Sequence, residues 1–68
     1  MSQTVDYTVT GMTCGHCVAS VTEEVQQVAG VTDVAVDLAS GGVRVTSEQP
    51  LSDADVRAAV EEAGYQLA

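Results

Sequence analysis

Residues 3–29, QTVDYTVTGMTCGHCVASVTEEVQQVA, decide the fold, because the spacing of their apolar side chains changes part-way along. Residues 3–10 alternate apolar and polar side chains, which is typical of a half-buried strand. From about residue 15 to residue 29 the apolar side chains recur every three or four positions, as on one face of a helix: Val18, Val21, Val25 and Val28. The stretch therefore predicts a strand, a loop and a helix.

The rest of the chain repeats these signals. A second strand is predicted from residue 31, with Val34, Val36 and Leu38 alternating with polar or small residues, and the sequence SGG at 40–42 predicts a hairpin turn. The remaining predicted elements are a third strand at 43–48, a helix from Ser52 as N-cap to Gly64, with Arg57 paired to Asp53 and Glu61, and a short strand at 65–68. This order predicts one α+β domain over residues 1–68 with a ferredoxin-like βαββαβ fold, in which two helices cover one face of a four-stranded antiparallel sheet.

The charge balance limits the partners. The formal net charge is −8, and the two cations are Arg44 and Arg57. Nucleic acids and anionic membrane surfaces need Lys or Arg for binding, so neither is predicted as a partner. The start of the chain has no basic region followed by a long apolar run, and no stretch is long enough for a membrane span. We therefore predict a cytoplasmic protein with reduced thiols.

The residues most able to carry chemistry are Cys14 and Cys17 in GMTCGHC, residues 11–17. Cys14 is predicted in the loop after the first strand, and Cys17 in the first turn of the following helix. The positive end of the helix dipole favours thiolate over thiol at such a position. Both cysteines are expected to be exposed enough to react.

Three uses of this pair remain open. Thiol–disulfide exchange fits a C-x-x-C at a helix start, although no aromatic residue precedes Cys14 and Pro50 stands before a helix. A zinc site needs four ligands, and only His16 lies near the two cysteines, so a second chain or outside ligands would be required. Cu(I) prefers soft thiolate ligands, and two suffice for it.

The combination of several motifs adds a family resemblance. GMTCGHC after a strand, together with GVTDVAVDL, GGVRV and EEAGYQL further along, resembles the heavy-metal-associated domain over residues 3–68. Within that family the chain looks most like the bacterial copper chaperones. The resemblance implies a protein that is not an enzyme, and that binds one Cu(I) through Cys14 and Cys17. It also implies transfer of the copper to the soluble metal-binding domain of a copper-exporting P-type ATPase.

The resemblance gives roles to four residues around the cysteines. It implies that Met12 packs beneath the loop and that Tyr65 faces the loop, where its hydroxyl can reach a sulfur. Thr13 precedes the first cysteine, next to which zinc and cadmium modules often have an additional carboxylate, so copper is favoured. His16 either tunes the thiolates or becomes a third ligand when two chains share copper.

Related proteins of the same fold keep other functions open. They include mercury-binding proteins made with a signal peptide and the N-terminal modules of metal-pumping ATPases, some of them specific for zinc or cadmium. No signal peptide and no following membrane segment are present in this sequence, which favours a free chaperone. We expect a monomer without copper and, because the thiols are expected to be accessible, a copper-bridged dimer as a possible loaded form.

Overall fold

The computed structural model describes residues 2–13 and 15–68, so Met1 and Cys14 lie outside the described residues. Its elements follow the predicted order. They are β1 (Gln3–Thr10), α1 (Gly15–Gln26), β2 (Val31–Asp37), β3 (Gly42–Ser47), α2 (Asp53–Glu62) and β4 (Gln66–Leu67). The predicted βαββαβ order is confirmed, and the predicted bounds of β1 agree with the structure.

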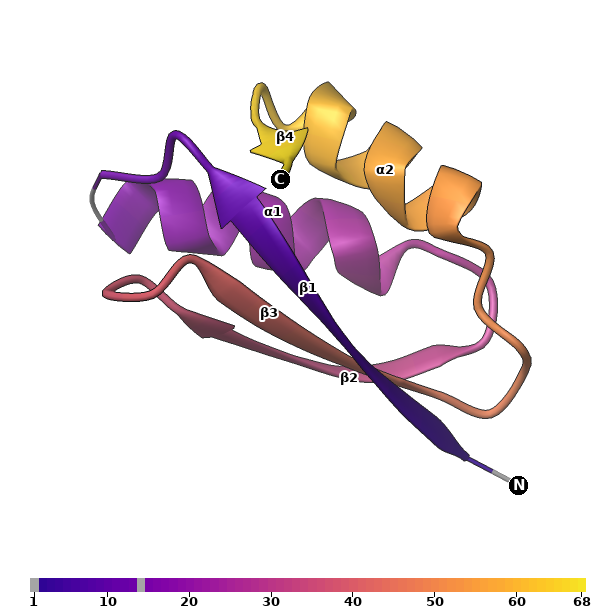
Figure 1. Ribbon diagram of the computed structural model, residues 1–68. Coiled ribbons are helices and arrows are strands. Elements are labelled where there is room, and N and C mark those ends of the chain that lie inside the picture. Colours follow the sequence, from indigo (N-terminus) through magenta and orange to yellow (C-terminus); the bar gives the residue numbers. More distant parts are fainter. Residues whose placement is uncertain (1, 14) are drawn as a thin grey trace.

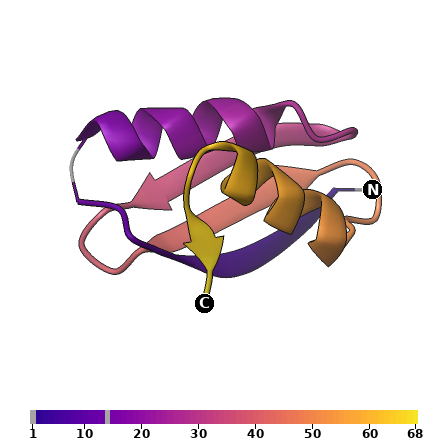
Figure 2. The same cartoon turned by 90° about the horizontal axis from the view of Figure 1, so that it is seen from above.

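The four strands form one antiparallel sheet in the order β2-β3-β1-β4. β1 lies between β3 and the two-residue β4, and it pairs with Ser47 at one end and with Leu67 near the other. Both helices cover the same side of this sheet, as the two views show (Figures 1 and 2). The ferredoxin-like arrangement predicted from the sequence is therefore confirmed.

The core is built almost entirely from valine. Strand alternation directs one set of valines toward the helices, and the helical stripes direct another set toward the sheet. The buried cluster consists of Val9, Val21, Val25, Val43, Val45, Val56 and Val60, each at most 3% exposed. Full burial of such a side chain stabilises the fold by about 1.5 to 3 kcal/mol. This small core holds the strands and helices together and thereby positions the loops that connect them.

The structure corrects the prediction for Leu38. The second strand ends at Asp37, and Leu38 lies in the following turn with 38% of its surface exposed. The Asp37 carboxylate accepts a hydrogen bond from Ala39 N at 3.0 Å, and the Asp37 carbonyl accepts one from Gly41 N at 2.9 Å. These two bonds turn the chain earlier than the sequence SGG at 40–42 suggests, so Leu38 never joins the inward-facing alternation.

The start of α2 also differs from the prediction. Ser52 occupies the N-cap position, but its side chain makes no capping hydrogen bond, and its carbonyl accepts from Asp55 N and Val56 N. Among residues 2–13 and 15–68, the single ion pair joins Arg44 to Asp6 at 2.9 Å, so the predicted pairs of Arg57 are wrong. Instead, Tyr7 on β1 donates a hydrogen bond to the Asp53 carboxylate at 3.0 Å.

None of the described helices is long and apolar enough to cross a membrane.

Candidate metal centre

The loop between β1 and α1 begins at Gly11, which has a φ of +92°. This left-handed conformation turns the chain out of the strand, and glycine adopts it without the steric penalty of a side chain. The next residue, Met12, is half-buried and packs against the valine core. This packing attaches one side of the loop to the core, and the role of Met12 beneath a metal site stays a prediction.

Cys17 is the third residue of α1 and is only 7% exposed. The expectation that both cysteines are exposed is therefore wrong for Cys17. The physical reason is helical spacing, because Cys17 lies on the same face as Val21 and Val25, which are fully buried in the core. Cys14 is the other predicted ligand and lies outside the described residues.

Thr13 connects the loop to the helix, because its hydroxyl lies 3.9 Å from the sulfur of Cys17, within hydrogen-bonding range for sulfur. The first turn of α1 contains no acidic residue. The Cys17 sulfur therefore lies near the positive end of a helix dipole, in a first turn without acidic residues. A helix start of this kind stabilises thiolate, which is the form of cysteine that binds metal.

Tyr65 reaches the loop from the opposite end of the chain. It lies between α2 and β4, is half-buried against the core, and donates its backbone N–H to the Val60 carbonyl at 3.1 Å. A methyl group on Gly11 would lie 3.4 Å from Cδ1 of the Tyr65 ring. The ring is thus in van der Waals reach of Gly11 in the loop. Its action on a sulfur stays a prediction.

His16 is exposed on α1, next to the buried Cys17. Within residues 2–13 and 15–68, no group of three His, Cys, Asp or Glu side chains gathers to hold a metal ion. The described part of the chain therefore supplies no carboxylate-rich cage, and the roles predicted for His16 stay predictions. The left-handed turn at Gly11 was not predicted, although a glycine between a strand and a cysteine loop is itself a signal of a tight turn.

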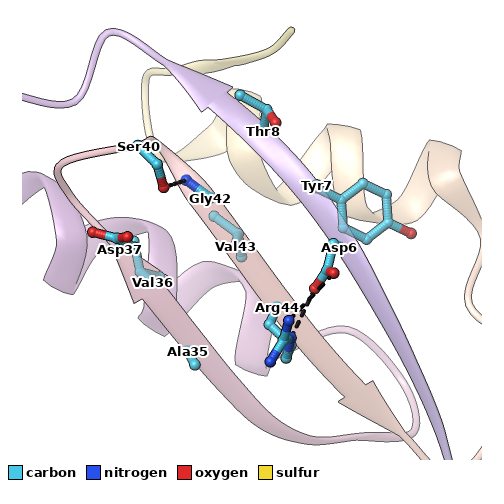
Figure 3. Close-up of a pocket in the computed structure, with 10 residues that line it drawn as sticks. All are labelled: Asp6, Tyr7, Thr8, Ala35, Val36, Asp37, Ser40, Gly42, Val43 and Arg44. Carbon is cyan, nitrogen blue, oxygen red and sulfur yellow. Dashed lines mark hydrogen bonds and ion pairs between the residues drawn. The ribbon is translucent and has the colours of Figure 1, made fainter.

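A hollow of about 470 Å³ lies elsewhere, on the face of the sheet that the helices leave open (Figure 3). Gly42 and Ala35 leave room for the hollow because they carry little or no side chain, and the Arg44–Asp6 ion pair is part of its lining (Figure 3). The hydrogen bond from the Arg44 guanidinium holds the pKa of Asp6 below its usual value. Among residues 2–13 and 15–68, no cysteine or histidine lines this hollow. We therefore place the candidate site at the loop.

A comparison with known protein families shows to which family the cysteine loop belongs. The family model of the heavy-metal-associated domain matches residues 6–66. The chain belongs to the heavy-metal-associated domain family. The matched range includes the whole cysteine loop and both helices. Membership makes the chain a metal-binding domain and not an enzyme.

Members with copper in their names are similar to this heavy-metal-associated domain. The copper chaperone CopZ of Bacillus subtilis is 39% identical over 61 residues, covering 88% of each chain. A copper-transporting ATPase of Rhizobium meliloti is 36% identical over 62 residues, which is 91% of this chain and 8% of that protein. The solved structure of a CopZ metallochaperone superposes with a TM-score of 0.90 at 30% identity, covering 97% of this chain and all of the other. The fold and a heavy-metal-binding role are thereby shown.

Proposed function

We propose that the protein is a cytoplasmic copper(I) chaperone, working as a single domain over residues 1–68. In this proposal Cys14 and Cys17 hold one Cu(I) as cargo and pass it to the soluble metal-binding domain of a copper-exporting P-type ATPase. The observation that carries the proposal is the environment of Cys17, which lies at the uncharged first turn of α1 with Thr13 at its sulfur. The similarity to named copper chaperones supports the choice of metal.

The donor chemistry favours Cu(I) over zinc. Cu(I) is soft and selects thiolates, whereas structural zinc takes four ligands in a tetrahedron. Residues 7–22 contain no Asp or Glu, so the loop offers sulfur and one imidazole but no nearby carboxylate. A Cu(I) ion that is held by two thiolates can still add a third thiolate ligand.

Transfer then follows as ligand exchange without a change of oxidation state. A thiolate of the acceptor adds to the copper, giving a three-coordinate intermediate shared by both proteins. A bond from copper to one cysteine of this chain breaks next, and a second acceptor thiolate replaces the remaining one. His16, exposed beside Cys17, is a proposed tuning residue or third ligand when two copies share copper. Tyr65 is proposed to restrain the release of metal.

A second candidate uses the same site. The match to 8% of a copper-transporting ATPase fits a metal-binding module of such a transporter. Cu(I) would be bound in the same way, and only the acceptor would differ.

An anaerobic competition titration tests the metal and the ligands. Reduced protein is set against a chromogenic Cu(I) chelator, and Zn(II) is run in parallel against a zinc indicator. We expect tight one-to-one Cu(I) binding and weak zinc binding. Cys14→Ser and Cys17→Ser should each abolish tight Cu(I) binding while circular dichroism shows an intact fold. Ser20→Ala, an exposed change on α1, is the matched control and should bind as the wild type does.

Three results would contradict the proposal. A double serine variant that competes for Cu(I) at wild-type strength would exclude this site. Zinc that outcompetes its indicator would replace copper as the cargo. Insulin reduction with turnover would identify an oxidoreductase.

A further inference from the structure

One end of the molecule carries little charge, although the Asp37 carboxylate borders it and accepts a hydrogen bond from Ala39 N at 3.0 Å. Residues 7–22 and 38–43 contain no Asp, Glu, Lys or Arg, although the whole chain has ten carboxylates. These segments meet in space, because Val9 N at the end of β1 donates to the carbonyl of Gly41 in the β2–β3 turn at 2.8 Å. Figure 2 shows the β1–α1 loop and the β2–β3 turn at the same end. We call residues 11–13, 15–20 and 38–41 the uncharged end.

Leu38 is the one large hydrophobic residue that is exposed in the described part of the chain. A single exposed leucine is ordinary on a protein surface. Its location is informative, because the turn that holds Leu38 is hydrogen-bonded to the last part of β1, just before the cysteine loop. The turn therefore displays an apolar side chain beside the candidate metal centre.

The distribution of charge makes this end the surface that is easiest to bury. Docking elsewhere would remove carboxylates from water or would need cations on the partner, and desolvating an unpaired charge is costly. The molecule is elongated, with extents of 33 × 19 × 18 Å. Contact through one end keeps the acidic body away from the partner, and salt screens charges over about 8 Å at physiological ionic strength.

From these observations we propose that Leu38 is a docking residue for the copper acceptor. Its side chain contacts an apolar surface on the acceptor while the adjacent loop exchanges copper. The occupant is an acceptor domain of the same fold. A copper-transporting ATPase contains a segment 36% identical to this chain, so such a domain exists in a transporter of copper. This inference rests on the proposed function, and it adds a residue that selects the partner through apolar contact.

Copper transfer measured by stopped flow tests the inference. Wild type, Leu38→Ser and Leu38→Met, each loaded with Cu(I), are mixed with the purified apo domain of a copper-transporting ATPase. Losing the apolar contact should slow transfer at limiting concentration by about three- to sevenfold in Leu38→Ser, because only the exposed 38% of the residue is left to bury. Leu38→Met keeps the apolar character and should restore the rate. Ala58→Ser, an exposed change on α2 outside the uncharged end, is the matched control.

Two additional measurements separate the possible failures. Cu(I) affinity and thermal unfolding of Leu38→Ser should equal those of the wild type, because the side chain is exposed and not a ligand. Wild-type protein that fails to bind Cu(I) would refute the proposed function itself. Wild-type protein that transfers copper, with Leu38→Ser transferring at the same rate, would overturn the docking role alone. A slower Leu38→Ser that also loses Cu(I) affinity would instead assign Leu38 to the support of the loop.

Discussion

Gly41 ends the turn between β2 and β3 with a φ of +76°, and its carbonyl accepts the hydrogen bond from Val9 N. A Cβ atom at Gly41 would lie 2.6 Å from the carbonyl oxygen of Val9, which belongs to the backbone and cannot rotate away. Gly64 after α2 has a similar φ of +94°, but a Cβ there would meet no atom within 4 Å. A side chain at Gly64 would therefore cause backbone strain alone, whereas a side chain at Gly41 would cause both backbone strain and steric overlap.

Replacement of each glycine by alanine measures these two effects. Gly64→Ala should lower the free energy of unfolding by about 1 to 2 kcal/mol, the usual penalty for a side chain in the left-handed region. Gly41→Ala should lower it by about 1 to 3 kcal/mol more, because the overlap forces β1 and the turn apart. Urea unfolding followed by circular dichroism gives both values. Equal losses in the two variants would contradict the steric contribution.

At the scale of elements, one hydrogen bond joins β1 to the beginning of α2. The Tyr7 hydroxyl donates to the carboxylate of Asp53, the first residue of α2, at 3.0 Å. Partial burial, and then the hydrogen bond and charge of Asp53, raise the pKa of Tyr7 above 10.0. A raised pKa means that the fold holds the proton more tightly than the unfolded chain does. The stabilisation is therefore complete below pH 10.0 and is lost as the pH rises through the folded pKa.

Tyr7→Phe tests this connection, since it removes the hydroxyl and keeps the ring that packs against the core. Below pH 10.0 the variant should lose about 0.5 to 1.5 kcal/mol of unfolding free energy, as expected for one hydrogen bond. Well above that pH the two proteins should approach equal stability. Urea unfolding at both pH values gives the comparison, with Asp53→Asn as a control that retains an acceptor. If the difference in unfolding free energy between the wild type and Tyr7→Phe did not change with pH, titration of Tyr7 would not be its cause.

For the whole molecule, repulsion from the net charge affects stability more than any individual ion pair does. The chain carries −8, its radius of gyration is 10.6 Å, and the Debye length at 0.1 M salt is about 10 Å. Charges across the molecule therefore repel one another in dilute buffer. The Arg44–Asp6 pair, the one ion pair among the described residues, is about two-thirds exposed on both sides and contributes little against this repulsion.

Added sodium chloride should accordingly raise the melting temperature of the apoprotein, because screening weakens the repulsion between carboxylates. Thermal unfolding from low salt to several hundred millimolar shows the trend. The double variant Glu23→Gln, Glu24→Gln removes two of the ten carboxylates and should respond less to salt. A melting temperature that falls with salt would mean that favourable charge pairs dominate.

The local pattern of the chain by itself determined the order of the elements and the identity of the core. Val21 and Val25 follow from helical spacing, and Val43 and Val45 follow from strand alternation, because each pattern is set by neighbours in sequence. The position of Cys17 in the first turn of α1 was predictable in the same way. The packing of Met12 came from the family resemblance, and Cys14 as a ligand remains a prediction.

Tertiary structure alone decided which residues meet around the loop. The approach of the Tyr65 ring to Gly11 depends on where distant segments of the chain close against one another. Asp53 likewise bonds to Tyr7, which is 46 residues away in sequence, and not to the nearby Arg57. Periodicity specifies which face of an element is apolar. It does not specify which polar groups lie opposite once the sheet register and the turns are fixed.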